Sequence, residues 1–533
     1  MATGPERKSS VEQAETIEEV QQNAYPTEHP LATLRSHPKL VLYALIANIG
    51  PLMFGYDLII VGAISALPKF RIDFGDHAGP TGAILPAIWL GLWNGLVQAG
   101  TAAGALFAGW FQDRFGRRAS FALGGLLGMI GTAFSYTCGM PDDMEARRGL
   151  FLFAKIVIGM GCGMLMSSCQ TYISEIAPKN VRGVLLGFYA FNVSLGHLIA
   201  VAIVFPNTSE MSSKAYRIPF ATQWVFGGLS VIVALLLPES PVWLIYKRKM
   251  DKATRSLNKL GTGNDESMLE RIQTTLATEA VTEDAGEGSG YSDCFKGTNL
   301  RRTAIIIWLN LIQQFVGMAL LTNGAYFLIM AGMSPQYSLM VNLIGVASNM
   351  VANAISWYTV PRFGRRTMIL FSISLDILAW ASMGIAACFS TQTAQWYVGV
   401  ALLLFGFFNS LGVASAVPVI ASEISTVRLR AKTGGIGFGA QCIAAWAFSF
   451  YTPYLYNTDQ ANWKGKIGFF FAGLSAVGYV ISWLTVPETK GRSFLDLDFL
   501  FGEKVKARAF RKTAVPSIDD DVDNQKEDGK ESF

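Results

Sequence analysis

The sequence predicts an all-α membrane protein of twelve transmembrane helices in two six-helix halves, and three observations support this prediction. Hydrophobic residues make up 51% of the 533 residues and charged residues only 15%, which is too few to cover a soluble protein of this size. The charges are concentrated in segments 1–39, 238–302 and 503–533. Short motifs also recur at matching positions in the two parts of the chain that lie between these segments.

The individual spans follow from the apolar runs between charged breaks, because a helix needs about 20 apolar residues to cross a bilayer. The expected spans are 40–67, 82–108, 119–138, 149–172, 184–205, 220–237, 303–331, 337–359, 367–389, 395–421, 432–453 and 466–486. The expected divisions are an N-terminal tail (1–39), an N-terminal half (40–237), a linker (238–302), a C-terminal half (303–486) and a C-terminal tail (487–533). Within the linker, 247–260 predicts a short helix and the acidic, Gly-rich part 279–290 predicts a flexible connection.

The orientation follows from the basic residues in short loops, which favour the cytosolic side. These loops contain DRFGRR (113–118), PKNVRG (178–183), RFGRR (362–366), RLRAK (428–432) and KGR (490–492). We therefore expect both tails in the cytosol of a multi-pass protein of the plasma membrane. No cleavable signal peptide is expected, because residues 1–38 are polar and acidic. Asn207, in an external loop, begins an Asn-Thr-Ser glycosylation acceptor.

Three pairs of motifs form an internal repeat. GWFQDRFGRR (109–118) matches WYTVPRFGRR (357–366), SEIAPKNVRG (174–183) matches SEISTVRLRA (422–431), and PESP (238–241) corresponds to PETKGR (487–492). The two members of each pair lie at corresponding positions in the two halves. Parallel repeats of this kind are typical of carriers whose two halves rock around a central site.

The repeated charged residues predict a cytosolic gate that is held by charge-assisted pairs and opens when they break. The gate residues are Asp113, Arg114, Arg117, Glu175, Arg182, Arg365, Glu423 and Arg430. An alternative is that the arginines only fix the topology. That alternative does not explain Glu175 and Glu423, which lie beside them.

With these motifs, the chain from about residue 40 to 512 resembles a major facilitator superfamily transporter of the sugar porter family. Two segments, AYRIPFATQW (215–224) and SEISTVRLRAKT (422–433), are most similar to the fungal α-glucoside (maltose-type) permeases. The resemblance implies the twelve-helix major facilitator fold and a transport function.

Two charged residues within the spans predict proton coupling, because a charge at the bilayer centre costs about 2.5–3.5 kcal/mol and needs a reason. Asp57 lies in FGYD (54–57), where the resemblance implies a proton acceptor. Lys155 stands where the family has arginine, so we expect it to be the charge partner of Asp57. The alternatives are a permanent ion pair for Asp57 and snorkelling to the interface for Lys155.

Five polar residues are the candidates for substrate contact. The resemblance places them at sugar-contact positions: His197, Gln313, Gln314, Asn323 and Gln441. Amides suit a polyol because each offers both a donor and an acceptor. The alternative is that these side chains only hold helices together.

Some positions depart from the family pattern. Ala190 and Ala319 replace a glutamine and an asparagine, Pro418 replaces an aromatic residue, and Ala414-Ser415 replaces a Gly-Pro pair. These departures put an ordinary glucose carrier in doubt. Asp376, within a span, matches no family role.

The sequence therefore predicts proton-coupled symport of a sugar (an α-glucoside, a hexose or a related polyol) by a monomer in the lipid bilayer. One alternative is a carrier that moves another polyhydroxylated compound or exports a fungal metabolite, and another is a non-transporting nutrient receptor. No enzyme is expected, because no nucleophile–base set or phosphate loop is present. The net charge of +4 and the scattered cysteines indicate no nucleic acid, metal or cofactor.

Overall fold

The computed structural model describes residues 35–77, 83–177, 179–261, 291–426, 429–492 and 494–513. Predictions for the two chain ends and for the acidic part of the linker, 279–290, lie outside the described residues. Within them the chain is almost wholly helical, and one short antiparallel hairpin joins β1 (Asp76–His77) to β2 (Ala83–Ile84).

The helices form two groups in chain order. The first consists of α3 (Pro38–Ala47), α4 (Ile49–Ile64), α5 (Pro68–Phe74), α6 (Ala87–Phe115), α7 (Arg117–Thr137), α8 (Met144–Ile176), α9 (Lys179–Val204), η1 (Phe205–Ser209) and α10 (Lys214–Leu236), followed by α11 (Pro241–Tyr246) and α12 (Met250–Leu260). The second consists of η3 (Tyr291–Phe295), α14 (Gly297–Phe315), α15 (Met318–Thr322), α16 (Gly324–Met330), α17 (Pro335–Phe363), α18 (Arg365–Ala386), α19 (Gln392–Leu411), α20 (Val413–Ile424), α21 (Arg430–Tyr456), η5 (Lys464–Lys466), α22 (Ile467–Thr485), α23 (Phe494–Gly502) and η6 (Ala507–Ala509).

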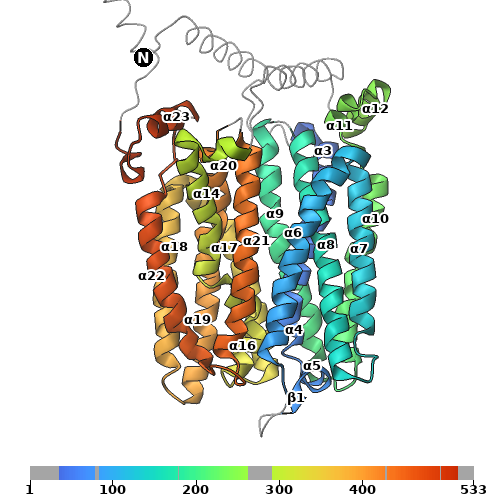
Figure 1. Cartoon of the computed structure of the whole chain (residues 1–533), viewed down its shortest axis with the longest axis vertical. Helices are drawn as coiled ribbons and strands as arrows, with labels where there is room; N and C mark the ends of the chain where they lie inside the picture. The colour runs from blue at the N-terminus through green and yellow to red at the C-terminus, as the bar shows by residue number, and fades with distance from the viewer. Residues whose placement is uncertain are drawn as a thin grey trace, which may run out of the picture.

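The helices are membrane spans by length and composition. Nine helical stretches of the described chain are long and apolar enough to cross a bilayer. The other expected spans, 82–108, 303–331 and 432–453, correspond to α6, to α14–α16 and to α21. These are also helical and run within the same bundle (Figure 1). The expectation of an all-α membrane protein is confirmed.

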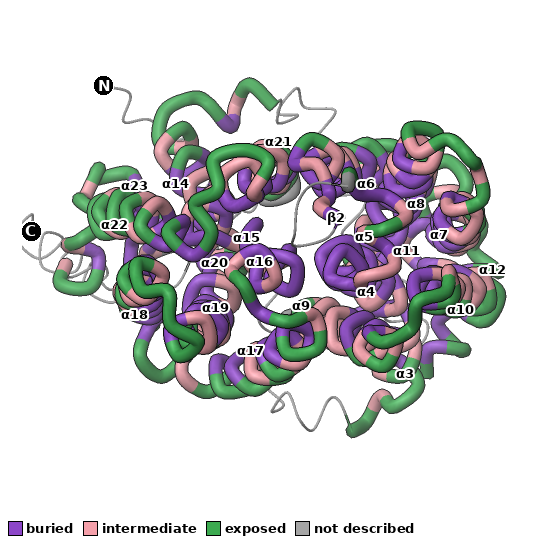
Figure 2. The backbone as a smooth tube through the Cα atoms, turned by 90° about the horizontal axis from the view of Figure 1, so that it is seen from below, coloured by how far each residue is buried: buried purple, intermediate pink, exposed green. Residues whose placement is uncertain are grey.

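The two groups lie side by side and together form one bundle (Figures 1 and 2). They meet where α6 packs against α21 and α9 packs against α17, while α4 contacts α15 and α16. The short helices α11, α12 and α23 lie at one end of the bundle, which we call the α12 end. The hairpin and α5 lie at the opposite end, which we call the β1 end.

Three of the expected spans are broken rather than continuous. Span 40–67 is divided between α3 and α4 at Asn48, and span 303–331 has a break between α15 and α16 at Asn323. Two further breaks are held by side chains of a neighbouring helix. The first break separates α14 from α15 at Gly317, whose φ of +104° lies in the left-handed region that favours glycine. The second separates α19 from α20 at Gly412. Both breaks are held by α18: Trp380 Nε1 donates to the Val316 carbonyl at 2.7 Å, and Ser372 Oγ donates to the Phe408 carbonyl at 2.7 Å. Such side-chain bonds replace the backbone bonds that a break removes.

Candidate coupling site and substrate pathway

A buried ion pair inside the bundle joins Asp57 of α4 to Lys155 of α8. Their side chains are only 2% and 1% exposed, and Lys155 Nζ donates to Asp57 Oδ1. The same oxygen accepts from Gln223 Nε2 of α10 at 3.0 Å. Gln223 is also buried, with 1% of its surface exposed. Helices α8 and α10 thus each supply one donor to the fully buried carboxylate of α4.

Glycines in α8 explain how Lys155 reaches this place. A Cβ at Gly159 would lie 2.5 Å from the Val97 carbonyl oxygen, and a Cβ at Gly163 would lie 2.0 Å from the Thr101 carbonyl oxygen. Only glycine permits this approach of α8 to α6. The glycine pattern after Lys155 therefore fixes the helix that carries the charge.

Because the ion pair is buried, removing the charge of only one of its two members is costly. Taking charges out of water costs several kcal/mol per ion, and the partner charge and hydrogen bonds offset that cost. A change that neutralises Asp57 also removes the charge that holds Lys155. The pair can therefore act as a switch that responds to one proton.

The candidate substrate residues do not gather in one cluster. Gln441 Nε2 of α21 donates to Gln313 Oε1 of α14 at 3.2 Å, so these two amides meet within the second group. Gln314 is buried on α14. His197 lies on α9 of the first group, and its Nε2 is buried with no partner among the described residues.

Asn323 lies at the β1-end side of the interface instead. Its Oδ1 accepts from Asn94 Nδ2 of α6 at 3.0 Å, and its Nδ2 donates to the Ala319 carbonyl at 3.2 Å. The bond to Asn94 joins the two groups. In this conformation Asn323 holds the groups together, with its side chain fully buried.

Further hydrogen bonds close the β1 end between the groups. The backbone N–H of Leu85 donates to the Tyr326 hydroxyl at 3.2 Å, and Asn457 Nδ2 donates to the Leu85 carbonyl at 2.7 Å. The backbone N–H of Ala87 donates to Asp459 Oδ2 at 3.0 Å. These contacts were not anticipated from the sequence, because none of them follows a repeat or a helical period.

One more bond joins the groups between α9 and α17. Asn353 Nδ2 donates to Ser194 Oγ at 3.1 Å, and Ser415 Oγ donates to Asn353 Oδ1 at 3.4 Å. Ser194 shares a helix face with His197. Ser415 is one of the residues that depart from the family pattern, and the contact gives it a partner in the second group.

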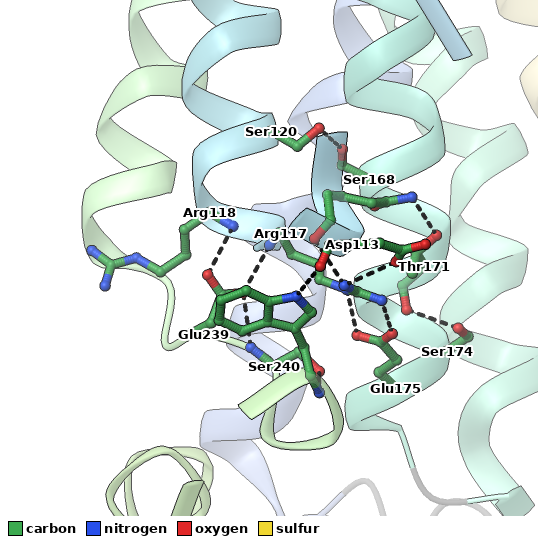
Figure 3. A network of polar contacts seen from close by, with 12 residues as sticks. Asp113, Arg117, Arg118, Ser120, Ser168, Thr171, Ser174, Glu175, Glu239 and Ser240 are labelled. Carbon is green, nitrogen blue, oxygen red and sulfur yellow. Dashed lines mark hydrogen bonds and ion pairs between the residues drawn. The ribbon is translucent and has the colours of Figure 1, made fainter. Parts of the chain in front are cut away.

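At the α12 end, the ion pairs among the described residues each join residues of one group. Arg117 Nε and Nη2 donate to the two carboxylate oxygens of Glu175 at 2.9 and 2.5 Å (Figure 3). Arg117 also lies 3.4 Å from the 72%-exposed Asp113. In the second group, Arg365 Nη2 donates to Glu423 Oε1 at 2.9 Å.

Of the remaining gate candidates, only Arg114 has a described side chain. The guanidinium of Arg114 lies over the ring of Phe115, 5.9 Å from its centroid. The side chains of Arg182 and Arg430 lie outside the described residues. The described ion pairs at the α12 end thus lie within each group, whereas hydrogen bonds join the two groups at the β1 end. The bundle is therefore closed at its β1 end.

Two acidic residues complete the α12-end networks and were not among the predicted gate residues. The backbone N–H of Arg117 donates to Glu239 Oε1 at 2.9 Å, and that of Arg365 donates to Glu488 Oε1 at 2.9 Å. Burial raises the pKa of Glu239, while the backbone N–H groups of Ser240 and Arg117 act in the opposite direction. Each carboxyl group thus caps the N-terminus of a span. The paired PESP and PETKGR motifs are the sequence signal for both.

The glycine of each RFGRR motif allows this capping. Gly116 has φ of +98°, and a Cβ there would lie 2.5 Å from Glu239 Oε2. We expect Gly116→Ala to destabilise the protein by about 1–2 kcal/mol, because an L-residue is strained at positive φ. Gly109→Ala is the matched control, since a Cβ at that helical position meets nothing within 4 Å. Thermal unfolding of the purified protein tests the difference, and equal midpoints for the two variants would contradict it.

The predicted glycosylation acceptor can also be placed. Asn207 lies in η1 at the β1 end, where its Nδ2 donates to the Ile203 carbonyl at 2.8 Å. Among the described residues, no group of three His, Cys, Asp or Glu side chains is arranged to hold a metal.

Two groups of helices that meet across a polar interface, closed at one end and with a buried ion pair inside, define a secondary carrier. Residues 43–501 match the sequence profile of the family described as "Sugar (and other) transporter". The chain belongs to this family, and it is a membrane transporter rather than an enzyme.

Two individual relatives and one solved structure can be compared with the chain. The chain is 31% identical to the MFS transporter fmqE of Aspergillus fumigatus over 491 residues, covering 90% of each protein. It is 29% identical to maltose permease MAL61 of Saccharomyces cerevisiae, covering 91% of this chain and 80% of the permease. Its fold is similar to the inward-open xylose transporter XylE of E. coli, with a TM-score of 0.70 at 23% identity, covering 86% of this chain and 99% of that one.

Proposed function

We propose that this protein is a proton-coupled symporter for a sugar, of the α-glucoside, hexose or related polyol class, working by alternating access. The observation that carries the proposal is the buried pair of Asp57 and Lys155, with Gln223 as a third member. The likeness to a maltose permease supports the substrate class.

The proposed cycle uses the proton to release the pair. A proton on Asp57 removes the charge that holds Lys155, so α4 and α8 can shift relative to each other. Substrate binding to the amides of Gln313 and Gln441 then favours rearrangement of the two groups. Because the membrane potential contributes about 2.3 kcal/mol per charge per 100 mV, one proton can concentrate the substrate many-fold.

We place the α12 end in the cytosol of a plasma-membrane protein with both tails inside. The basic loops of the RFGRR motifs lie at this end, as the positive-inside rule requires. The closed β1 end then faces outward. The conformation described is therefore an inward-facing one, with the bonds of Asn323, Asn457 and Asp459 sealing the outside.

A second candidate keeps the mechanism and changes the cargo to another polyhydroxylated compound, including an exported metabolite. Pro418 in α20 supports it, because this position lacks the aromatic ring that stacks on a sugar in the family pattern. The contact of Ser415 with Asn353 also reshapes this part of the interface. The two candidates differ in which compounds are transported and in which direction.

The test is uptake by vesicles containing the purified full chain, with a panel of labelled mono- and disaccharides that includes maltose. We expect accumulation of at least one α-glucoside or hexose under an inward proton gradient, and its loss when an uncoupler is added. Uptake that is unaffected by the uncoupler would contradict proton coupling. Absence of sugar uptake, together with transport of another polyol, would favour the second candidate.

The amide pair makes a further prediction about affinity. We expect Gln313→Ala and Gln441→Ala each to raise the apparent KM, because a lost hydrogen bond leaves a partner unsatisfied at a cost of about 1–3 kcal/mol. Asn299→Ala is the control, since Asn299 lies near the α12 end of α14, away from the interface. Unchanged KM in both glutamine variants, at equal surface expression, would remove them from the site.

A further inference from the structure

Asp376 is a buried acid to which the proposed coupling mechanism gives no role. It lies in the middle of α18 and is fully buried, and neither carboxyl oxygen has a hydrogen-bond partner among the described residues. The nearest arginine on its own helix face, Arg365, is eleven residues away, or about 16 Å along the axis. An isolated carboxylate in such a place would cost far more than a neutral acid. Burial without a partner favours the neutral form of such an acid.

No charged neighbour offers an alternative partner. The titratable side chains on the helices that pack against α18, and on α18 itself, are Tyr337, Tyr358, Arg362, Arg365, Arg366, Tyr397, Glu423, Lys464, Lys466 and Tyr479. None of them forms a hydrogen bond or ion pair with Asp376. Arg365 is paired with Glu423, and Arg366 donates to the Val486 carbonyl at the α12 end.

The position of Asp376 on α18 links it to two helix breaks of the second group, those at Gly317 and Gly412. Ser372, Asp376 and Trp380 follow one another at intervals of four residues and so share one face of the helix. Ser372 holds the carbonyl of Phe408, next to the break between α19 and α20. Trp380 holds the carbonyl of Val316, next to the break between α14 and α15. A movement at either break therefore changes the surroundings of the acid between them.

A donor for the ionised form lies on the neighbouring helix. α18 and α22 (Figure 1) run antiparallel, because Arg366 bonds to the end of α22 while a Cβ at Gly468, near its start, would lie 2.8 Å from the Gly384 backbone nitrogen. Counting two turns from Gly468 along α22 and two turns back from Gly384 along α18 brings Ser475 to the level of Asp376. The Ser475 hydroxyl is buried and has no partner among the described residues.

We propose that Asp376 is a second proton-binding site of this carrier, neutral while the β1 end is closed and ionised when the helix breaks move as that end opens. On opening, the carboxylic acid releases its proton to water that enters from the β1 end, and the carboxylate accepts from the Ser475 hydroxyl and water. The site is separate from the pair of Asp57 and Lys155, which lies in the other group of helices. It requires neither that pair nor a bound substrate.

The test compares the protonation of Asp376 in the two arrangements by infrared difference spectroscopy on the full chain in lipid vesicles, with protons as the only ligand. Wild type represents the closed β1 end. Gly62→Trp is used to open it, because even a Cβ at Gly62 would lie 2.4 Å from the Thr322 carbonyl oxygen across the closed interface. Gly91→Trp is a second opening variant, since a Cβ there would lie 2.6 Å from the Phe450 carbonyl oxygen.

The carboxylic-acid C=O band of Asp376 is assigned by its loss in Asp376→Asn and by its displacement in Asp376→Glu, which keeps an acid if the first variant folds poorly. We expect the band in wild type at neutral pH and its loss in both opening variants. A band of equal size in all three proteins would show a permanently neutral acid and overturn the proposal. So would an ionised Asp376 in wild type. Since no sugar is needed, the outcome is independent of whether the proposed symport is correct.

Discussion

Asp57→Asn is expected to abolish accumulation of substrate against a gradient while sparing exchange of substrate across the membrane. The amide keeps the shape of the side chain, and its oxygen can still accept from Gln223 and Lys155. It cannot take up and release a proton, so substrate movement loses its link to the proton gradient. Vesicles loaded with unlabelled sugar measure exchange, and vesicles with an imposed proton gradient measure accumulation.

The control for this variant is Glu210→Gln, which neutralises an exposed acid at the β1 end. It should leave both accumulation and exchange unchanged. Accumulation that persists in Asp57→Asn and still collapses with an uncoupler would move the coupling site away from Asp57. His197 would then be a candidate, because its Nε2 is buried without a partner among the described residues.

Lys155→Met should cause the largest loss of stability, about 3–5 kcal/mol at neutral pH, because it leaves Asp57 as a buried, uncompensated charge. In this variant Asp57 can become neutral by binding a proton, so the stability of the variant protein should rise as the pH falls. Adding Asp57→Asn to Lys155→Met removes the charge and should recover most of the stability. Accumulation should stay absent in the double variant. Thermal unfolding across a pH series measures the stability of wild type, Lys155→Met and the double variant.

Lys69→Met is the matched control for that series. Lys69 also donates to an aspartate, Asp73, at 2.8 Å, but the two side chains are 23% and 13% exposed. Because this i,i+4 pair is partly accessible to water, we expect its loss to cost less than the loss of the fully buried pair. If Lys155→Met were no more destabilising than Lys69→Met, Asp57 would not depend on Lys155 for its charge.

Features that depend on one helix or on a repeat could be predicted from the sequence. The apolar runs predicted the helical segments of the bundle, because length and hydropathy determine which segments can cross a membrane. The Arg and Glu motifs predicted charged networks at one end, and the structure pairs Arg117 with Glu175 and Arg365 with Glu423. The contact of Lys155 with Asp57 joins two separate helices, and it was expected because the resemblance places Lys155 where the family has arginine.

Other features that depend on the packing of separate helices could not be predicted. Gln223 is an uncharged residue in an apolar span, and only the approach of α10 to α4 brings it to Asp57. The bond between Asn353 and Ser194 likewise depends on how α9 crosses α17. Apolar runs do not reveal breaks, so α3–α4, α14–α16 and α19–α20 were each expected as one continuous helix. The breaks become visible only through backbone conformation, such as the positive φ of Gly317.

Proton movement on addition of sugar tests the proposed coupling most directly. Vesicles containing the full chain and a trapped pH indicator are mixed with a transported sugar, with no proton gradient imposed beforehand. We predict that wild type carries protons inward together with the sugar and acidifies the interior, and that Asp57→Asn takes up the sugar with no change in internal pH. Sugar uptake by wild type without any proton movement would contradict proton-coupled symport.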